Sequence, residues 1–316
     1  MTASPWKRQV IVTVCAAAAA LGGCGPRTPA KAMSRAELVR QYNANAAAAP
    51  RLWARAKIEV SLPDAKGRKF TWGSTSPLSS PNGLLLLVKE AGRGDRQDFV
   101  LMGLAPGATE LFRLGSSLSE GVYYLWYNYG DRGAAWWGRH EYAAAPGVEM
   151  PLDPSDLLSV LCVTELPEDY THLPTVTLRL EESPPSYVLT YLANQPVSGE
   201  VVVRREVHFN WDDKPPRPFL VKLFDANGRV VMTARLGDYK PIRIASEGVA
   251  APLAPTDILI IWPEKSSRLH ITLSEMSAVK VWNREQFLFE RNLPRELPLA
   301  NVTQVDKDLG TQEGPP

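Results

Sequence analysis

Short stretches in which apolar and polar residues alternate, separated by turn residues, recur along most of this chain. The first spans residues 51–60, and its apolar members are Leu52, Ala54, Ala56, Ile58 and Val60. A period of two places successive side chains on opposite faces of a strand, so one face of this strand is expected to be buried. The turn residues Asp64 to Gly67 then predict an antiparallel return over residues 68–73.

Similar stretches continue to the C-terminal region, with turn residues between them. Asn227-Gly228 is one such connection, and this dipeptide is a strong hairpin signal. The pattern predicts about ten to twelve antiparallel strands among the candidate ranges. The remaining candidate ranges are 84–89, 98–103, 109–114, 121–128, 134–142, 176–182, 187–193, 200–211, 219–224, 230–239, 258–262 and 269–275.

Two neighbouring candidate strands, 121–128 and 134–142, carry large residues at successive positions, such as Tyr124-Leu125-Trp126 and Trp136-Trp137. A sheet with one wet face would not place large apolar side chains on both sides. We expect that both faces of this pair are covered, or that one of them lines a cavity.

Two helices interrupt the strand pattern. Ser34, with Glu37 three residues later, fits a capping box at the start of a helix over residues 35–49, which ends before Pro50. Asp153 as N-cap and Pro154 at the first helical position predict a short helix through about Leu161.

The expected fold class is mainly β (α+β), with a single large, strongly curved antiparallel sheet and the two helices on its concave side. The predicted folded domain spans residues 34–293. Residues 294–316 are polar and contain several prolines, which predicts a loosely attached, flexible C-terminal tail.

The N-terminal region carries a targeting signal. Lys7 and Arg8 precede an uncharged apolar run from Val10 to Ala20, and Leu21-Gly22-Gly23-Cys24 follows. This order resembles a bacterial lipoprotein signal peptide with its lipobox, in which cleavage before the cysteine leaves an acylated N-terminal Cys24. Residues 1–23 are then the signal peptide and residues 24–33 the membrane linker.

Two other interpretations of this region are an ordinary secretory signal and an uncleaved N-terminal anchor. The lipoprotein interpretation is favoured because all three of its parts occur in the expected order. Several acyl chains, at about 0.8 kcal/mol per buried methylene, hold a protein on a membrane almost permanently. Gly25 follows the cysteine, and the absence of aspartate there favours the outer membrane, with the body facing the periplasm.

Charge and cysteine usage narrow the function classes. The chain has 35 Lys and Arg residues against 34 Asp and Glu residues, without a basic run, so nucleic acid is not an expected partner. Of its three cysteines, Cys15 leaves with the signal and Cys24 is acylated. Cys162 lies in an apolar stretch and is expected to be a buried small side chain. No later stretch is apolar for long enough to cross a membrane.

The sequence contains none of the motifs expected of an enzyme or a metal protein. The four histidines, at positions 140, 172, 208 and 270, are far apart and show no metal-ligand spacing. The serines of residues 115–121 miss the spacing of a nucleophile elbow, and Gly92-Arg93-Gly94 lacks the rest of a phosphate-binding loop. We expect no enzyme activity, no cofactor and no metal, although a triad of distant residues stays open.

The order of elements resembles the LolA/LolB-type lipoprotein carriers and related mycobacterial lipid-binding lipoproteins. It runs from the lipobox through a linker, a helix ending in Pro50-Arg51-Leu52-Trp53 and a long meander to the strand with Trp136-Trp137. The helix of Leu152-Asp153-Pro154-Ser155-Asp156-Leu157-Leu158 and a second meander come next. The resemblance covers roughly residues 34–239 and leaves residues 240–316 as an extension that the family pattern does not require.

The resemblance implies an incomplete β-barrel whose apolar concave face holds acyl chains under a lid of helices. It also implies a protruding loop with an exposed leucine, for which Leu104 is the candidate, although Leu104 is more simply interpreted as a strand end. The candidate lipid-binding residues are large apolar side chains of the first meander, and ordinary core packing is the favoured alternative for each. They are Leu86, Phe99, Leu101, Phe112, Tyr124, Trp126 and Trp137.

The leading functional hypothesis is a membrane-anchored envelope lipoprotein that binds lipid or lipoprotein acyl chains in an apolar cavity, for transfer to the outer membrane. Hydrocarbon is recognised by area and shape, so such a site needs a dry concavity and few fixed hydrogen bonds. The alternative is a structural or scaffolding lipoprotein that recruits an envelope protein partner and carries no lipid cargo. A periplasmic hydrolase is a third and weaker hypothesis.

Overall fold

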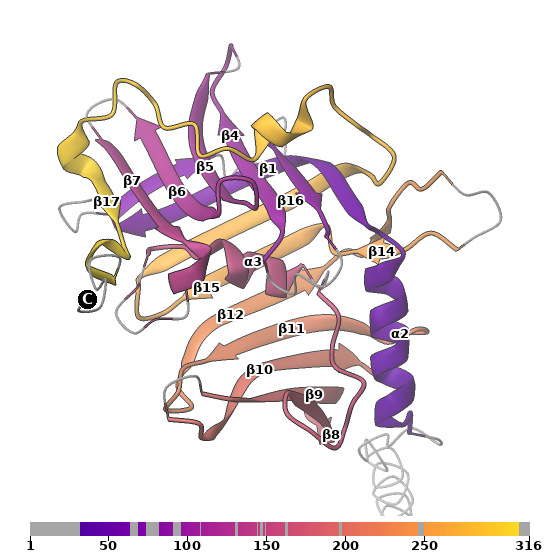
Figure 1. The fold of residues 1–316 in the computed structure, drawn as a ribbon. Coiled ribbons are helices and arrows are strands. Elements are labelled where there is room, and N and C mark those ends of the chain that lie inside the picture. The colour runs from indigo at the N-terminus through magenta and orange to yellow at the C-terminus, as the bar shows by residue number, and fades with distance from the viewer. Residues whose placement is uncertain are drawn as a thin grey trace, which may run out of the picture.

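The protein forms one large, mostly antiparallel sheet of fifteen strands that curves around a short helix (Figure 1). The computed structural model describes residues 32–309 except 64–68, 74–81, 91–95, 108, 130–131, 144, 146–147, 149, 162–163, 196–197 and 246–249. Over these residues the sheet runs from β17 at one edge to β8 at the other and is not closed into a barrel. The predicted mainly β fold with a single curved sheet is confirmed. The predicted signal peptide, Cys24 and Cys162 lie outside the described residues.

The sheet has two halves, each built mainly from consecutive strands of the chain. The first half contains the first meander: β1 (Arg51–Pro63), β2 (Lys69–Gly73), β3 (Gly83–Val88), β4 (Asp98–Leu104), β5 (Glu110–Ser117), β6 (Val122–Tyr129) and β7 (Arg132–Arg139). The second half contains β8 (Thr175–Glu182), β9 (Pro185–Asn194), β10 (Val201–Asn210), β11 (Arg217–Phe224) and β12 (Val230–Gly237).

Two strands of the C-terminal extension join the halves. β16 (Ser267–Ser277) pairs with β1 through register pairs such as Ile58 with Ile271, and β15 (Asp257–Trp262) pairs with both β16 and β12. Two strands of the extension beyond residue 239, β15 and β16, therefore form the centre of the sheet. A separate small ladder pairs β13 (Lys240–Pro241) with β14 (Leu253–Ala254).

Both predicted helices form where their capping residues indicated. α2 (Arg35–Ala47) begins at Ser34, whose hydroxyl accepts a hydrogen bond from the Glu37 N–H. α3 (Pro154–Val160) begins at Asp153, whose carboxylate accepts from the Ser155 N–H at 2.8 Å, with Pro154 at the first position. Proline fits there because the first helical N–H has no partner within the helix. Over the described residues, no helix is both long and apolar enough to cross a membrane.

The inner face of the sheet holds one continuous apolar core that spans both halves. In the first half it contains the alternate residues of β1, from Leu52 to Leu62, which are almost fully buried. In the second half it contains Val207 and Phe209 of β10. α2 adds Leu38, Val39 and Tyr42 to this core, and α3 adds Leu157 and Leu158, packing against β5 and β6.

The outer face of the first half is covered by residues 279–301, here called the strap. The strap comes after β16 and crosses the strands before reaching β17 (Val302–Gln304) (Figure 1). Its Phe289 packs with Leu86 and Val100, and its Leu297 packs with Tyr124 and Trp126. Large residues occupy both faces of β6 and β7 because both faces are covered.

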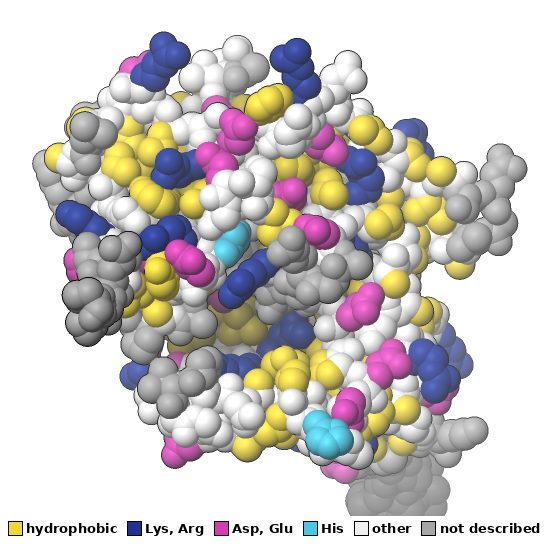
Figure 2. All heavy atoms as spheres, in the orientation of Figure 1, with side chains coloured by type: hydrophobic (Ala, Val, Ile, Leu, Met, Phe, Trp, Pro, Cys, Tyr) yellow, Lys and Arg dark blue, Asp and Glu magenta, His cyan; other side chains and the backbone are white. Residues whose placement is uncertain are grey.

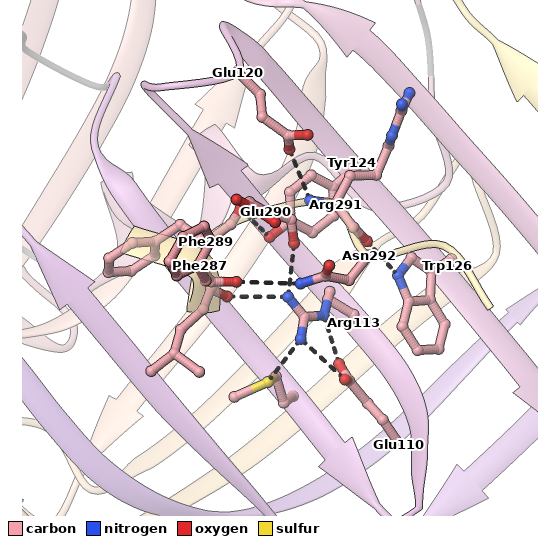
Figure 3. Close-up of polar contacts among 12 residues, drawn as sticks. Glu110, Arg113, Glu120, Tyr124, Trp126, Phe287, Phe289, Glu290, Arg291 and Asn292 are labelled. Atoms are coloured by element: carbon pink, nitrogen blue, oxygen red, sulfur yellow. Dashed lines mark hydrogen bonds and ion pairs between the residues drawn. The ribbon is translucent and has the colours of Figure 1, made fainter. Parts of the chain in front are cut away.

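Arg113 of β5 fixes the strap from below (Figure 3). Its guanidinium donates to the carbonyls of Leu288 and Glu290 at 3.0 and 2.7 Å, and it pairs with both carboxylate oxygens of Glu110 at 2.6 and 2.9 Å. Burial alone would lower the pKa of Arg113, but the hydrogen bond and charge of Glu110 outweigh it and raise that pKa. A charge that is only 4% exposed is thus fully compensated.

The C-terminal region differs from the predicted flexible tail over its described part. β17 pairs in parallel with β7, and the Asp306 carboxylate accepts from the Arg139 N–H at 2.7 Å and from its guanidinium at 3.2 Å. A buried carboxylate with these partners holds residues 302–306 on the sheet. The sequence pattern missed β17 because a strand of three residues is too short to show an alternation. Three short 3₁₀ turns, η4 (Glu285–Leu288), η5 (Leu299–Asn301) and η6 (Lys307–Leu309), complete the region, and η3 (His140–Tyr142) comes after β7.

Candidate functional site

A large open recess lies on the inner face, between α3 and the second half of the sheet (Figure 2). This recess, here called the hollow, has a volume of about 1040 Å³. Small-molecule sites commonly measure roughly 300 to 1,000 Å³. The hollow is therefore large enough for a long, flexible ligand. It is bounded by the residues Ala143, Ala145, Ser155, Asp156, Ser159, Thr164, Glu165, Leu166, Pro167, Pro174, Tyr191, Ala193, Asn194, Arg204, Arg205, Leu223, Phe224 and Val231.

The sheet side of the hollow carries apolar side chains, such as Tyr191 and Leu223, beside the basic Arg204 and Arg205. Tyr191 of β9 and Leu223 of β11 both pair with Arg205 of β10, so these three side chains lie on the same face. That face also carries Val207, a core residue two positions further along β10. The apolar wall of the hollow therefore continues the core of the second half, at a place that α2 and α3 leave open.

The opposite side of the hollow is more polar and comes from α3 and the segment after it. Asp156 accepts a hydrogen bond from the Trp262 indole N–H at 2.7 Å, which connects α3 to β15. The segment after α3 is held by Asn43 of α2, whose side chain bonds both the N–H and the carbonyl of Leu166 at 2.8 and 2.9 Å. α3 and the segment that α2 holds in place therefore form the side of the hollow opposite the sheet.

Arg205 lies in the wall of the hollow and is only 8% exposed. It donates one hydrogen bond to the Thr164 hydroxyl at 3.3 Å, and its guanidinium lies 5.6 Å from the centre of the Tyr191 ring. No carboxylate among the described residues forms an ion pair with it. A guanidinium has five N–H donors, so most of its capacity meets no acceptor within the described part of the chain.

The seven residues predicted from the sequence are not gathered around the hollow. Phe99, Leu101 and Phe112 lie on the inner face of the first half, at most 1% exposed, within the continuous core. They lie on the same face of the sheet as the hollow and in the same apolar core, but neighbouring side chains fill the space around them.

The other four predicted residues lie on the outer face, under the strap. Leu86 packs with Phe289, and Trp137 lies 4.2 Å from the Arg291 guanidinium. The Tyr124 hydroxyl donates to the Phe289 carbonyl at 2.7 Å, and the Trp126 indole donates to the Arg291 carbonyl at 2.8 Å (Figure 3). Burial raises the pKa of Tyr124, so its hydroxyl stays a donor. In this structure these four side chains hold the strap in place.

Sequence reasoning missed the residues that do line the hollow, among them Tyr191, Arg205 and Leu223. One signal was present: Arg205 occupies the alternate position to Val207 and Phe209, so a charged residue stands in line with core positions. An interruption of that kind marks either a strand end or a functional group on a buried face.

The predicted candidate for an exposed leucine, Leu104, is the last residue of β4 and is half-buried. It borders a second recess of about 560 Å³ on the other side of the sheet, together with Trp53, Leu84 and Trp282. Its simpler interpretation, as a strand end, is confirmed.

The described histidines form separate contacts with different partners. His208 lies 3.4 Å from both Glu181 and Glu206, and burial lowers its pKa, while His270 contacts Asp257 at 2.7 Å. His140 Nε2 lies 3.2 Å from the hydroxyl of Ser116, which is itself only 3% exposed. Across the described parts of the chain, no three His, Cys, Asp or Glu side chains are grouped as metal ligands would be.

Comparisons with known proteins give similarity of structure at low sequence identity. No protein-family model matches the chain, and no curated protein matches its sequence. A domain assigned as an outer membrane lipoprotein-sorting protein from Vibrio parahaemolyticus is similar at 12% identity and a TM-score of 0.45, over 81% of this chain and 98% of that one. A DUF1329 family protein from Desulfovibrio piger gives 13% identity and a TM-score of 0.44, over 81% and 95% of the two chains. A LolA superfamily protein from Nitrosomonas europaea gives 11% identity and a TM-score of 0.40, over 80% and 98%.

Proposed function

We propose that this protein is an envelope lipoprotein that binds the acyl chains of lipids or lipoproteins in the hollow and carries or delivers them at the outer membrane. The observation that supports this most directly is the hollow itself, an open recess of about 1040 Å³ whose sheet wall carries apolar side chains such as Leu223 and Phe224 beside two arginines. An acyl chain gains about 25 cal/mol for each Å² of apolar surface it buries, without needing a fixed set of hydrogen bonds. A recess with an apolar wall meets that requirement.

The place where the chain enters the fold also supports the proposal. The Met33 N–H donates to the Tyr187 hydroxyl at 3.2 Å, and Arg35 donates to the Val176 carbonyl at 3.2 Å. The start of α2 therefore lies at the edge of the second half, which is the half that borders the hollow. A linker over residues 24–33 spans at most about 35 Å, so acylation of Cys24 would hold this half close to the membrane.

α3 provides a cover in the proposed carrier. It is only seven residues long, borders the hollow and packs against β5 and β6. Phe112 lies on β5, and Phe99 and Leu101 lie on the neighbouring β4. We infer that a larger cargo displaces α3 and reaches these side chains, which gives them the lipid-binding role predicted from the sequence.

Photocrosslinking in the membrane-anchored full chain tests the proposal. Benzoylphenylalanine replaces Leu223 in the wall of the hollow or, as the matched control, Ile261, an apolar residue of β15 that is 40% exposed and does not line the hollow. After irradiation, mass spectrometry of the labelled peptide should find a lipid adduct at position 223 and none at position 261. The same cells labelled with radioactive palmitate should show label in the wild type and none in Cys24→Ser.

Two results would count against the proposal. Equal lipid adducts at both positions would mean that the membrane, and not the hollow, supplies the lipid. A protein adduct at position 223 without lipid would favour the scaffolding lipoprotein, which uses the same surface to hold an envelope protein.

A further inference from the structure

The two arginines buried in the described structure differ in how their charge is compensated. Arg113 is 4% exposed and meets a bidentate carboxylate and two backbone carbonyls. Arg205 is 8% exposed and meets one hydroxyl and one aromatic ring. A buried charge needs an opposite charge or a full set of hydrogen bonds, and the remaining N–H groups of Arg205 are not among the enclosed, unpaired atoms of the described residues, so they open to the hollow. The site around Arg205 is therefore incomplete within the described chain.

The acidic residues that border the hollow do not complete it. Asp156 is engaged with the Trp262 indole, and Glu165 is exposed. Neither forms an ion pair with Arg205 among the salt bridges of the described residues, and the neighbouring Arg204 adds a second positive charge to the wall. An anion that enters the hollow meets two adjacent basic side chains.

The surroundings of Arg205 define what kind of anion fits. Its strand neighbours on the same face, Tyr191 and Leu223, are large and apolar. A planar guanidinium binds carboxylate or phosphate oxygens through paired N–H donors. A ligand for this place has an anionic carboxylate or phosphate group joined to hydrocarbon.

We propose that Arg205 binds the anionic head group of the cargo, so that the hollow selects anionic acyl lipids over neutral or zwitterionic ones. This rests on the proposed acyl-chain binding and adds the charge of the ligand to it. Arg205 fixes the head group, and the apolar wall beside it takes the chain. A charge-assisted hydrogen bond contributes about 1.5 to 3 kcal/mol, which corresponds to a preference of roughly tenfold or more.

The test is competitive lipid binding to the purified full chain. The protein is mixed with detergent micelles that contain equal amounts of phosphatidylglycerol and phosphatidylcholine with the same acyl chains, and native mass spectrometry counts both complexes. The wild type should carry at least about ten times more phosphatidylglycerol. Arg205→Gln should lower this ratio severalfold while phosphatidylcholine binding is kept, and Arg205→Lys should restore part of the preference. Arg55→Gln, an exposed arginine outside the hollow, should leave the ratio unchanged.

The outcomes separate this inference from the proposed function. Lipid complexes without a charge preference in the wild type, or a ratio that is unchanged in Arg205→Gln, would overturn the role of Arg205 and leave acyl-chain binding in place. Absence of both lipids from the wild type would overturn both. Because the wild-type ratio needs no mutation, the inference is tested even where Arg205→Gln fails to fold.

Discussion

The two halves of the sheet are built from the same kind of strand meander but use their faces differently. The first half is covered on both sides, by α3 within and by the strap outside. The second half is covered by α2 over part of its inner face and opens to the hollow over the rest. The difference shows how one continuous sheet combines a rigid support with a binding surface, because the hollow lies beside the half whose inner face is only partly covered.

The largest loss of stability is expected for a substitution at the place where the strap is fixed to the first half. Arg113→Met removes the guanidinium that binds Glu110 and the Leu288 and Glu290 carbonyls, which leaves a carboxylate and two carbonyls without those donors. We expect a loss of about 3 to 5 kcal/mol in the free energy of unfolding, measured by guanidinium titration.

Arg55→Met is the matched control for this prediction. Arg55 pairs with Glu275 at 3.0 Å, but both side chains are more than half exposed. Its loss should change the free energy of unfolding by less than about 1 kcal/mol. Equal effects of the two substitutions would mean that the strap is not a structural cover.

A pair of leucine truncations compares the inner faces directly. Leu101→Ala opens a cavity in the packed first half, where Leu101 is fully buried, and should cost about 2 to 5 kcal/mol. Leu223→Ala enlarges a space that is already open and should cost about 1 kcal/mol, because little new cavity is made.

Urea unfolding of both leucine variants, followed by tryptophan fluorescence, gives the comparison. A loss at Leu223 as large as that at Leu101 would show that the hollow is closed by side chains in solution. The distinction between a packed and an open half would then fail.

The smallest expected change in stability concerns Asp306, at the edge of the first half. Burial alone would raise the pKa of Asp306, but hydrogen bonds from the Arg139 N–H, the Gln304 amide and the Arg139 guanidinium outweigh it and lower that pKa. A carboxyl whose pKa is lowered by folding stabilises the protein above its unfolded pKa of about 3.9, and this contribution is lost as the pH falls through the folded value.

Asp306→Asn should therefore lower stability by about 1 to 2 kcal/mol at pH 6 and by less at pH 3, where the carboxyl of the unfolded chain is already protonated and part of the wild-type contribution is lost. Denaturant midpoints at the two pH values measure this difference. Asp212→Asn, at an exposed carboxyl after β10, should leave both midpoints nearly unchanged. A wild-type midpoint that responds to pH no more than that of Asp306→Asn would contradict the role of Asp306 in holding β17.

Local signals predicted most of the elements of the fold but not its site. Ser34 and Asp153 marked both helix starts because capping is a property of a few neighbouring residues. The alternation of β1 predicted a buried face for the same reason. In β6, however, Tyr124 and Leu125 are both large and apolar, so the sequence could not show that one packs under the strap and the other in the inner core. That assignment depends on the strap, which comes from a distant part of the chain.

The hollow could not be predicted from the sequence for a related reason. The hollow exists because α3 is too short to cover the whole inner face of the sheet. How much of that face a helix covers depends on how the elements pack together, and no local sequence signal shows it. Arg205 could be seen as a charged residue in line with core positions, but only its neighbours in space, Thr164 and Tyr191, show that no acid of the described chain meets it.

The pairing of β1 with β16 has a consequence for how this protein is made. β1 is the first strand to leave the ribosome and β16 is the last long one among the described residues, yet they lie side by side in the middle of the sheet. Neighbours so distant in sequence make folding slow, because a very long loop must close before their contact forms. The two halves of the sheet stay unjoined until β15 and β16 have been synthesised, so a nascent chain truncated before residue 267 exposes the seam edge of β1 as an unpaired strand.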